Sequence, residues 1–206
     1  MLRVAQIAPD TEAEGPGRRF AVWVQGCPMR CAGCCNPQML RFEGGEEIDP
    51  TVLADRALAT DGVEGVSLLG GEPFAQPAAC AAFAHRVRSA GLGVMVYTGF
   101  TLGELEAKRG AGEPGVGELL DACDLLVDGR YDRERPEKTR RWIGSTNQTM
   151  HFLTDRYRAD DPRLRTPNSV ELRLRRGPDG PELIVNGWPA LAAAVTEGPR
   201  RGFRAR

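Results

Sequence analysis

The sequence of 206 residues is poor in lysine and in long apolar runs. Only two of its 27 basic residues, Lys108 and Lys138, are lysine, and the net charge is −1. No global basic field therefore points to nucleic acid or to an anionic membrane as a partner. No run approaches the roughly 18 apolar residues of a membrane-spanning helix. Because the opening MLRVAQIAPD lacks the features of a secretory signal, we expect a cytoplasmic protein.

Cysteine is concentrated in one short segment. Four of the six cysteines, Cys27, Cys31, Cys34 and Cys35, lie in GCPMRCAGCCNP (26–37). In a reducing cytosol, clustered cysteines are more often metal ligands or catalytic groups than structural disulfides. A disulfide framework is also disfavoured because two of these cysteines are adjacent in the sequence. A zinc site, a redox dithiol and an iron–sulfur cluster remain to be compared.

The absence of a second cysteine or histidine pair argues against structural zinc, which usually takes its ligands from two such pairs. The only two histidines, His85 and His151, are far apart in the sequence. A thioredoxin-like dithiol would use Cys31 and Cys34 and leave Cys27 unexplained. Three thiolates can instead hold three irons of a [4Fe–4S] cluster, so that the fourth iron is open to a substrate or cofactor.

The other three cysteines fit different roles. Cys80 and Cys123 are isolated in the sequence, and we expect both in the core. Cys35 is either a bystander or a reactive thiol near the cluster.

Strand-like and helix-like segments alternate through the first 130 residues. Strands are predicted over 2–8, 19–26, 63–71, 92–99 and 123–129, and helices over 49–60, 77–90, 102–108 and 115–122. Asp49 is the expected N-cap of the first helix. Apolar strands that alternate with helices indicate a parallel sheet in an α/β fold.

The pattern changes in the last third of the chain. A polar loop is predicted over 131–141, a further strand over 149–157 and a linker over 158–169. Alternation on both sides of Pro-Asp-Gly predicts a β-hairpin over 170–187, followed by a short helix near 189–196 and a basic tail. We expect one hairpin face to pack on the body while Glu171, Arg173 and Arg175 point outward. The hairpin would either cover an open sheet edge or shape access for a macromolecular substrate.

Four motifs, in order over about residues 1–155, resemble those of the radical S-adenosylmethionine (SAM) enzymes. They are EGPGRRFAVWVQGCPMRCAGCCNP (14–37), GGEP (70–73), LLVDGRY (125–131) and GSTNQ (144–148). The resemblance is to the small enzymes that activate glycyl radical enzymes, in particular the activating proteins of anaerobic ribonucleotide reductase. It implies a radical SAM core domain over 1–157, with 158–206 as linker, hairpin and tail. Since the chain is too short for eight strand–helix units, we expect an incomplete parallel (β/α) barrel of about five or six strands.

The resemblance implies that Cys27, Cys31 and Cys34 hold a [4Fe–4S] cluster whose open iron binds SAM. The expected cofactor-side residues are Gly70, Gly71, Glu72, Thr98, Asp128 and Asn36. Glu72 would pair with the methionyl ammonium, and the two glycines would let the backbone approach the ligand. Thr98 would lie near the cofactor or near a monovalent cation, and Asp128 would be a cofactor- or cation-side acid. The alternative for Glu72 is a strand-to-helix turn, for Thr98 a helix N-cap or turn residue, and for Asp128 an Asp-Gly turn.

Two further segments are assigned local roles. Asn36 is expected to cap the cysteine loop through backbone bonds. Ser145, Asn147 and Gln148 either line the pocket or lock their loop by side-chain hydrogen bonds.

By the same resemblance, the enzyme would cleave SAM reductively to a 5′-deoxyadenosyl radical and thereby activate a glycyl radical partner, such as anaerobic ribonucleotide reductase. Flavodoxin or ferredoxin would supply the electron. Two alternatives stay open: a radical enzyme that modifies a small molecule or peptide, and a non-catalytic iron–sulfur or zinc module. GGEP argues against the module.

Overall fold

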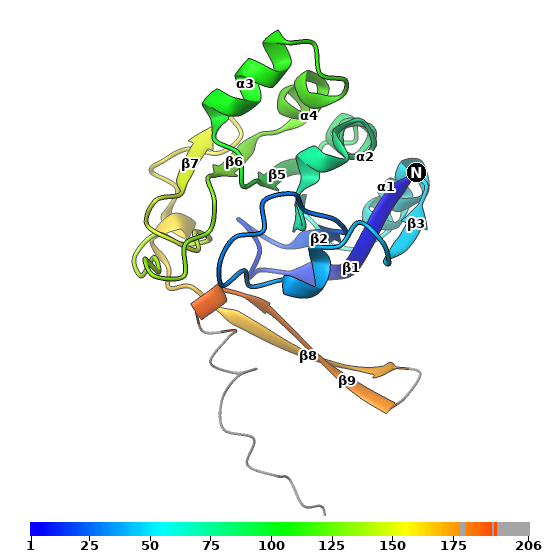
Figure 1. Cartoon of the computed structure of the whole chain (residues 1–206). Helices are drawn as coiled ribbons and strands as arrows, with labels where there is room; N and C mark the ends of the chain where they lie inside the picture. Colours follow the sequence, from blue (N-terminus) through cyan, green and yellow to red (C-terminus); the bar gives the residue numbers. More distant parts are fainter. Residues whose placement is uncertain (178–179, 191, 193–206) are drawn as a thin grey trace, which may run out of the picture.

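The structure, a computed structural model, describes residues 1–177, 180–190 and 192, and its centre is a seven-stranded sheet (Figure 1). The strands are β1 (Leu2–Thr11), β2 (Arg19–Val24), β3 (Glu46–Ile48), β4 (Gly65–Gly70), β5 (Gly93–Tyr97), β6 (Leu125–Asp128) and β7 (Thr149–Phe152). Their order is β3-β1-β2-β4-β5-β6-β7. β2, β4, β5 and β6 are parallel, whereas β1, β3 and β7 join antiparallel.

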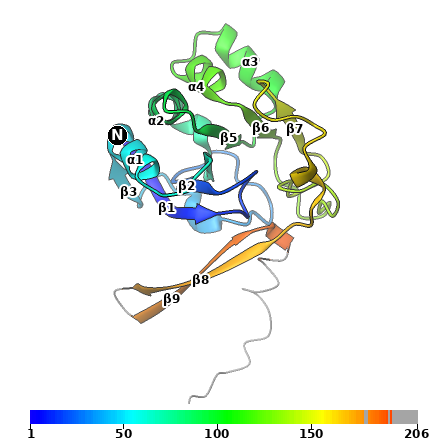
Figure 2. The ribbon, with the colours of Figure 1, turned by 180° about the vertical axis from the view of Figure 1, so that it is seen from behind.

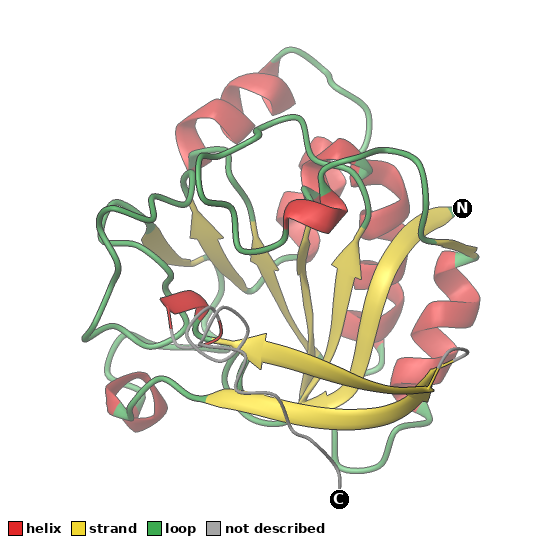
Figure 3. Cartoon of the chain, turned by 60° about the horizontal axis from the view of Figure 1, so that its bottom comes forward, coloured by secondary structure: helices red, strands yellow, loops and turns green. Residues whose placement is uncertain are grey.

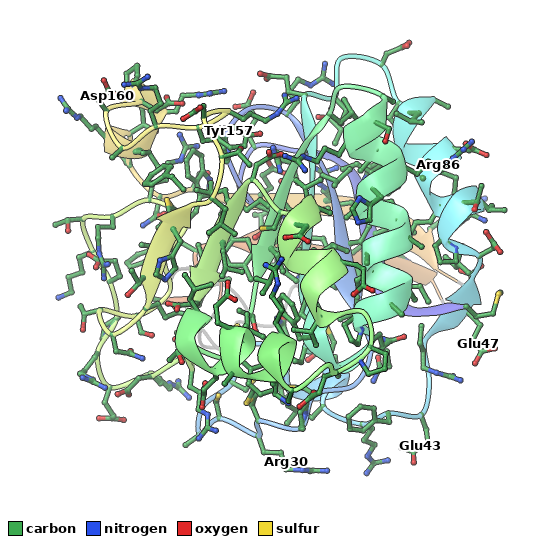
Figure 4. The ribbon with its side chains drawn as sticks, turned by 90° about the horizontal axis from the view of Figure 1, so that it is seen from above. Arg30, Glu43, Glu47, Arg86, Tyr157 and Asp160 are labelled. Carbon is green, nitrogen blue, oxygen red and sulfur yellow. The ribbon has the colours of Figure 1, made fainter. Side chains whose placement is uncertain are left out.

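Four α-helices cover one face of this sheet (Figures 1 and 2). They are α1 (Pro50–Leu58), α2 (Pro77–Ser89), α3 (Leu102–Gly110) and α4 (Val116–Ala122), and short 3₁₀ turns are η1 (Pro37–Met39), η2 (Pro73–Ala75) and η3 (Pro162–Arg165). Viewed from above, α2, α3 and α4 lie in front of the parallel strands (Figure 4). The predicted N-cap of α1 is confirmed, because the Asp49 carboxylate accepts from the amides of Thr51 and Val52.

Side-chain alternation along β2 separates two apolar layers. Phe20, Val22 and Val24 belong to the main core, which packs the sheet against the helices. Ala21 and Trp23 belong to a smaller cluster on the opposite face. Because successive strand residues point to opposite faces, this second face is left without helices and is available to loops.

The α/β class, the largely parallel centre and the hairpin are confirmed, but the expected incomplete barrel of about five or six strands is not. The sheet has seven strands instead of five or six, and it is open, with β3 and β7 at its edges. β3 escaped prediction because it has only three residues, two of them exposed. β1 and β3 run antiparallel to their neighbours, so the sheet is mixed.

The hairpin, β8 (Val170–Gly177) and β9 (Gly180–Gly187), forms a two-stranded sheet of its own (Figure 3). The expected orientation of its faces is wrong. The Glu12 amide donates to Glu171 over 2.8 Å, and Arg173 donates to the carbonyl of Asp10. Leu172 and Leu174, by contrast, are 57% and 80% exposed. The polar face turns inward because the end of β1 presents polar main-chain groups there.

Among the described residues, the hairpin does not pair with either edge strand of the central sheet. Its Glu171 and Arg173 side chains bond the main chain at the end of β1, and its role in covering an open edge stays a prediction. The side chain of Arg175, the turn residues 178–179 and most of the predicted helix and tail (193–206) lie outside the described part of the chain. Within that part, no helix has the length and apolar character needed to cross a membrane.

Candidate functional site

The face of the sheet opposite the helices borders a cavity of about 740 Å³. Cys27, Cys31, Cys34 and Cys35 line it from the cysteine loop, and Trp23, Leu69 and Tyr97 line it from the sheet. Glu72 lies at the end of β4, and Leu183 to Gly187 line the cavity from the hairpin. In parallel sheets, ligands sit beyond the carboxyl ends of the strands, and the GGEP turn and Thr98 follow two such ends.

The cysteine loop is closed by main-chain hydrogen bonds at its base. Gly26 N donates to Met39 O over 2.9 Å, and Cys27 N donates to Leu40 O over 3.3 Å. Inside the loop, Cys34 N donates to Cys31 O over 3.2 Å. Arg30, between the first two cysteines, points away from the body (Figure 4). The protein backbone therefore holds the two ends of the loop together without help from the thiols.

The cysteines differ in their ionisation. Burial raises the pKa of Cys27 and of Cys31. A hydrogen bond from the Cys35 thiol lowers the pKa of Cys34 because it stabilises the thiolate. Cys34 is thus the thiol of the loop that most readily becomes a thiolate, which is the form that binds metal.

The donor set fits a cluster better than a single ion. All six cysteines are free. Among the described residues, no three His, Cys, Asp or Glu side chains are arranged to hold one metal ion. A [4Fe–4S] cluster takes each thiolate on a different iron, so its ligands do not converge on one point. Three cysteines spread over one cavity wall are compatible with that demand.

The GGEP turn is hydrogen-bonded to the start of the cysteine loop. Gly71 N donates to Val24 O over 2.8 Å, and Glu72 N donates to Gly26 O over 2.9 Å. A Cβ added at Gly71 would lie 2.3 Å from Gly26 O, closer than real contacts allow. Gly70 has φ +99°, a conformation that favours glycine. Both glycines thus have a reason in the protein itself, namely the positive φ at Gly70 and the close approach of Gly26 at Gly71.

Glu72 is a buried carboxylate with three protein donors. It is 1% exposed, and it accepts from Phe74 N (2.9 Å), Thr98 Oγ1 (2.9 Å) and Gly99 N (2.8 Å). Burial raises its pKa from 4.5 to about 7, against the effect of these hydrogen bonds. Thr98 and Glu72, both chosen from the sequence, therefore lie in direct contact on the cavity wall.

Asp128 and Asn36 are placed differently. The Asp128 carboxylate accepts from Leu102 N over 2.6 Å and lies 2.9 Å from His151 Nε2, and Asp128 is not among the residues that line the cavity. Its described contacts belong to the start of α3 and to β7. Asn36 lines the cavity; its amide donates to Cys34 Sγ over 3.4 Å, and its carbonyl accepts from Met39 N. These are the backbone bonds expected of it.

The segment 144–148 is held by side-chain hydrogen bonds, one of the two expected roles, and Gln148 also lines the cavity. Gln148 Oε1 accepts from the amides of Gly144 and Ser145, and its Nε2 donates to Gly129 O over 2.9 Å. Ser145 Oγ accepts from Asp132 N, and Asn147 Nδ2 donates to Arg130 O. The motif thus holds the loop after β6 against the cavity. Cys80 and Cys123 are buried in the core, as expected.

Arg19 and Glu14 are among the buried charged residues that escaped the sequence analysis. Arg19 is fully buried and donates to Ser67 Oγ, Tyr157 Oη and main-chain carbonyls, including Gly93 O. Tyr157 lies at the rim of the sheet seen in Figure 4. Glu14 lines the cavity, and burial raises its pKa to about 7. Both stand in EGPGRR (14–19), the beginning of the longer motif that contains the cysteine loop.

Comparisons with known proteins identify the family of this chain. The family of 4Fe-4S single cluster domains matches residues 13–151. The anaerobic ribonucleoside-triphosphate reductase-activating protein of Vibrio cholerae is 31% identical over 157 residues, which covers 72% of this chain and 97% of that protein. Proteins of the same name from Escherichia coli and Enterobacteria phage T4 are 28% and 26% identical and cover 72% and 73% of this chain. The chain therefore belongs to the family of anaerobic ribonucleoside-triphosphate reductase-activating proteins, with a 4Fe-4S single cluster domain.

Proposed function

We propose that this protein is a radical SAM activating enzyme that forms the glycyl radical of an anaerobic ribonucleoside-triphosphate reductase. Cys27, Cys31 and Cys34 hold one [4Fe–4S] cluster, and SAM binds at the open iron. The observation that carries the proposal is that these cysteines line the same cavity as the buried carboxylate of Glu72. Flavodoxin or ferredoxin is the proposed electron donor.

When bound, the cluster and SAM supply the radical chemistry, in which an electron cleaves the sulfonium to methionine and a 5′-deoxyadenosyl radical that abstracts hydrogen. The protein binds, orients and shields these groups. Cys35 donates a hydrogen bond to Cys34 and favours its thiolate. Glu72, ionised, pairs with the methionyl ammonium, while Thr98 and Gly99 N fix the orientation of its carboxylate. Trp23, Leu69 and Tyr97 supply walls that exclude water.

The remaining expected residues fit this proposal unequally. Gly70 and Gly71 act by bringing the cysteine loop beside Glu72, as well as by leaving room for a ligand. Asp128 supports it least, since its described contacts are with α3 and β7, and a monovalent cation beside it gains no support. In the proposed division, residues 1–157 carry the cofactors, and the segment from 158 adds one wall of the cavity.

Anaerobic reconstitution with iron and sulfide, followed by metal analysis, tests the ligand assignment. We expect about four irons and four sulfides per chain. Cys27→Ala, Cys31→Ala and Cys34→Ala should each lose the cluster, and Cys35→Ala is the matched control that keeps it. A cluster lost in Cys35→Ala but kept in Cys27→Ala would overturn the assignment.

A second measurement tests the reaction. The reconstituted protein, reduced with dithionite or flavodoxin, should release 5′-deoxyadenosine from SAM, and the reductase should acquire a glycyl radical detectable by electron paramagnetic resonance. SAM cleavage without any radical on the reductase would leave a radical SAM enzyme with another substrate.

A further inference from the structure

The hairpin, β8 and β9, lies beyond the segment that matches the 4Fe-4S family, which ends at residue 151. It is nevertheless fastened to the core by buried polar contacts. Asn186 Nδ2 donates to Thr11 Oγ1 over 3.0 Å and lies 3.4 Å from Glu14 Oε1. Asn186 is 4% exposed. A segment fixed in this way has a defined position relative to the cavity.

The edge of β9 that does not pair with β8 faces the cavity. Residues 183–187 all line the cavity, although their side chains alternate between the two faces of the hairpin. No described residue of β8 lines it. Since a face of a strand would contribute only every second residue, the free edge of β9 is the part directed at the cavity.

The register identifies which main-chain groups of β9 are on that edge. Trp188 N donates to Ser169 O over 3.0 Å, and the strand pairs continue as Glu171↔Asn186 and Arg173↔Ile184. These are the hydrogen-bonded pairs of the antiparallel ladder, because such pairs alternate with non-bonded ones. The amides and carbonyls of Leu183 and Val185 therefore point away from β8.

Two observations agree with this assignment. Gly187 is two residues after Val185, so its main-chain groups point to the same edge of β9, and its main chain hydrogen-bonds the Glu14 carboxylate on the cavity side. Among the described residues, the hydrogen bonds outside the ladder include none to the main chain of Leu183 or Val185. Pro181 occupies the next outward position of the strand and has no amide to offer. Pairing along this edge is thus confined to Leu183 and Val185, next to the cavity.

An apolar strip accompanies this edge. Leu172, Leu174 and Leu183 are 57%, 80% and 53% exposed, and Leu183 also lines the cavity. Unpaired edges and exposed apolar strips are usually blocked in soluble proteins, because they invite pairing with other chains. Here the two features occur together at the entrance to the proposed reaction site.

The size of the cavity restricts what can pair there. It has about 740 Å³, and in the proposed function it also holds the cluster and SAM. A folded domain cannot enter such a space, whereas an extended chain can. Pairing with a free strand edge selects an extended chain by its main chain, and apolar contacts beside the edge select alternate side chains.

The geometry points to the free edge of β9 at Leu183 and Val185 as the docking strand for the glycine-bearing segment of the reductase, which adds to the hairpin as a third strand. This inference rests on the proposed function and deepens it. The segment enters extended, with apolar side chains near its glycine that contact Leu183 and Val185, which lie on the same face of β9. The hairpin would thus determine which protein reaches the cofactor.

The test compares Val185→Pro with Val185→Ala in the reconstituted full chain. Proline removes an amide that the ladder does not use but the docked segment does, whereas alanine keeps it. The readout is the ratio of glycyl radical formed on the reductase to 5′-deoxyadenosine released. We expect this ratio to fall at least tenfold in Val185→Pro and less than threefold in Val185→Ala. Equal ratios in the two variants would overturn the proposal.

A second measurement does not depend on how the proline variant folds. Binding of a synthetic peptide that carries the radical glycine of the reductase is compared with binding of the same peptide N-methylated at alternate amides. We expect methylation of one of the two alternating sets of amides to weaken binding to the wild-type protein at least tenfold, and Leu183→Ser to weaken binding of the unmodified peptide. If neither set of N-methylated amides weakens peptide binding, the proposal is overturned.

Other occupants give different results. If the wild-type protein is a dimer and Val185→Pro makes it a monomer, a second copy of the chain occupies the free edge of β9. These two results together would overturn the proposal. An unmodified peptide that binds tightly only after removal of residues 193–206 would show the tail on the edge, against the proposal. If the wild-type protein cleaves SAM but gives no radical on the reductase, the proposed function itself fails. This outcome is measured on the wild-type protein alone, so it is distinct from any effect of the variants.

Discussion

The raised pKa of Glu72 makes a quantitative prediction about SAM binding. Its carboxyl has a pKa of about 7, and the proposed ion pair with the methionyl ammonium needs the ionised form. At pH 6 about one-tenth of the groups are ionised and at pH 8 about nine-tenths, from the one-proton titration. We therefore expect the Kd for SAM to fall about tenfold between pH 6 and pH 8. Calorimetry on the reconstituted, oxygen-free protein measures it.

Glu72→Gln should remove this dependence. The amide keeps the volume of the side chain but carries no charge, so the lost charge-assisted contact, worth roughly 1.5–3 kcal/mol, should weaken binding at pH 8 by about 10- to 100-fold. Glu14→Gln is the matched control, because Glu14 lines the same cavity and also has a pKa of about 7. If Glu72→Gln keeps the wild-type affinity at both pH values, Glu72 only stabilises its turn.

The same shift has a consequence for folding with a definite sign. The pKa of Glu72 is about 7 in the folded protein and 4.5 without perturbation, so between these values the folded state binds more protons than the unfolded state. The contribution of Glu72 to the free energy of unfolding is fully present below pH 4.5 and is lost as the pH rises toward 7. The loss is about 3 kcal/mol, from about 1.4 kcal/mol per unit of pKa shift. Urea unfolding of the cluster-free protein at pH 5 and pH 8 should show this loss, and Glu72→Gln should reduce it. A slope that Glu72→Gln leaves intact would assign the loss to Glu14.

Three further substitutions test other parts of the structure. Arg19→Met should cost about 3–5 kcal/mol of unfolding free energy, because it removes buried hydrogen bonds, including the 2.7 Å bond to Tyr157; thermal unfolding checks this, and a loss below 1 kcal/mol would contradict it. Gly71→Ala should cost roughly 1–3 kcal/mol and reduce cluster content, since its Cβ would lie 2.3 Å from Gly26 O, and iron analysis of the folded fraction is the measurement. Gln148→Ala should raise protease sensitivity in the loop before β7 by severalfold while the melting temperature falls by only a few degrees; an unchanged cleavage rate would remove its locking role.

The parts of the fold that were predictable are those with a strong local signal. Predicted α2 and β4 agree with the structure within two residues, because their apolar periodicity and flanking glycine or proline residues are clear. β3 was not predictable, since its three residues are stabilised by pairing with β1, far away in sequence. The hairpin was predictable as a hairpin but not in its orientation, because alternation defines two faces without showing which one meets the core.

The site shows the same division. The cysteine spacing and GGEP identify residues that the structure brings to one cavity. Arg19 was missed because a charged residue in a strand ordinarily points to solvent, and its partners are carbonyls and hydroxyls that carry no sequence pattern. Asp128 was selected for its position at a strand end, yet the side chain turns to Leu102 N and His151. Strand ends are visible in a sequence, whereas side-chain direction depends on neighbours that pack later.

The closed base of the cysteine loop bears on how this protein meets oxygen. Gly26 and Cys27 are joined to Met39 and Leu40 by main-chain bonds, which do not involve the cysteine thiols. In zinc fingers, by contrast, loss of the metal unfolds the domain. Here the loop would stay closed if the cluster were oxidised and lost, and it could bind a new cluster. The conformational entropy of closing the loop would then not be lost again at each repair. We therefore expect a protein built in this way to stay folded when its cluster is lost in air and to bind a cluster again when iron and sulfide return.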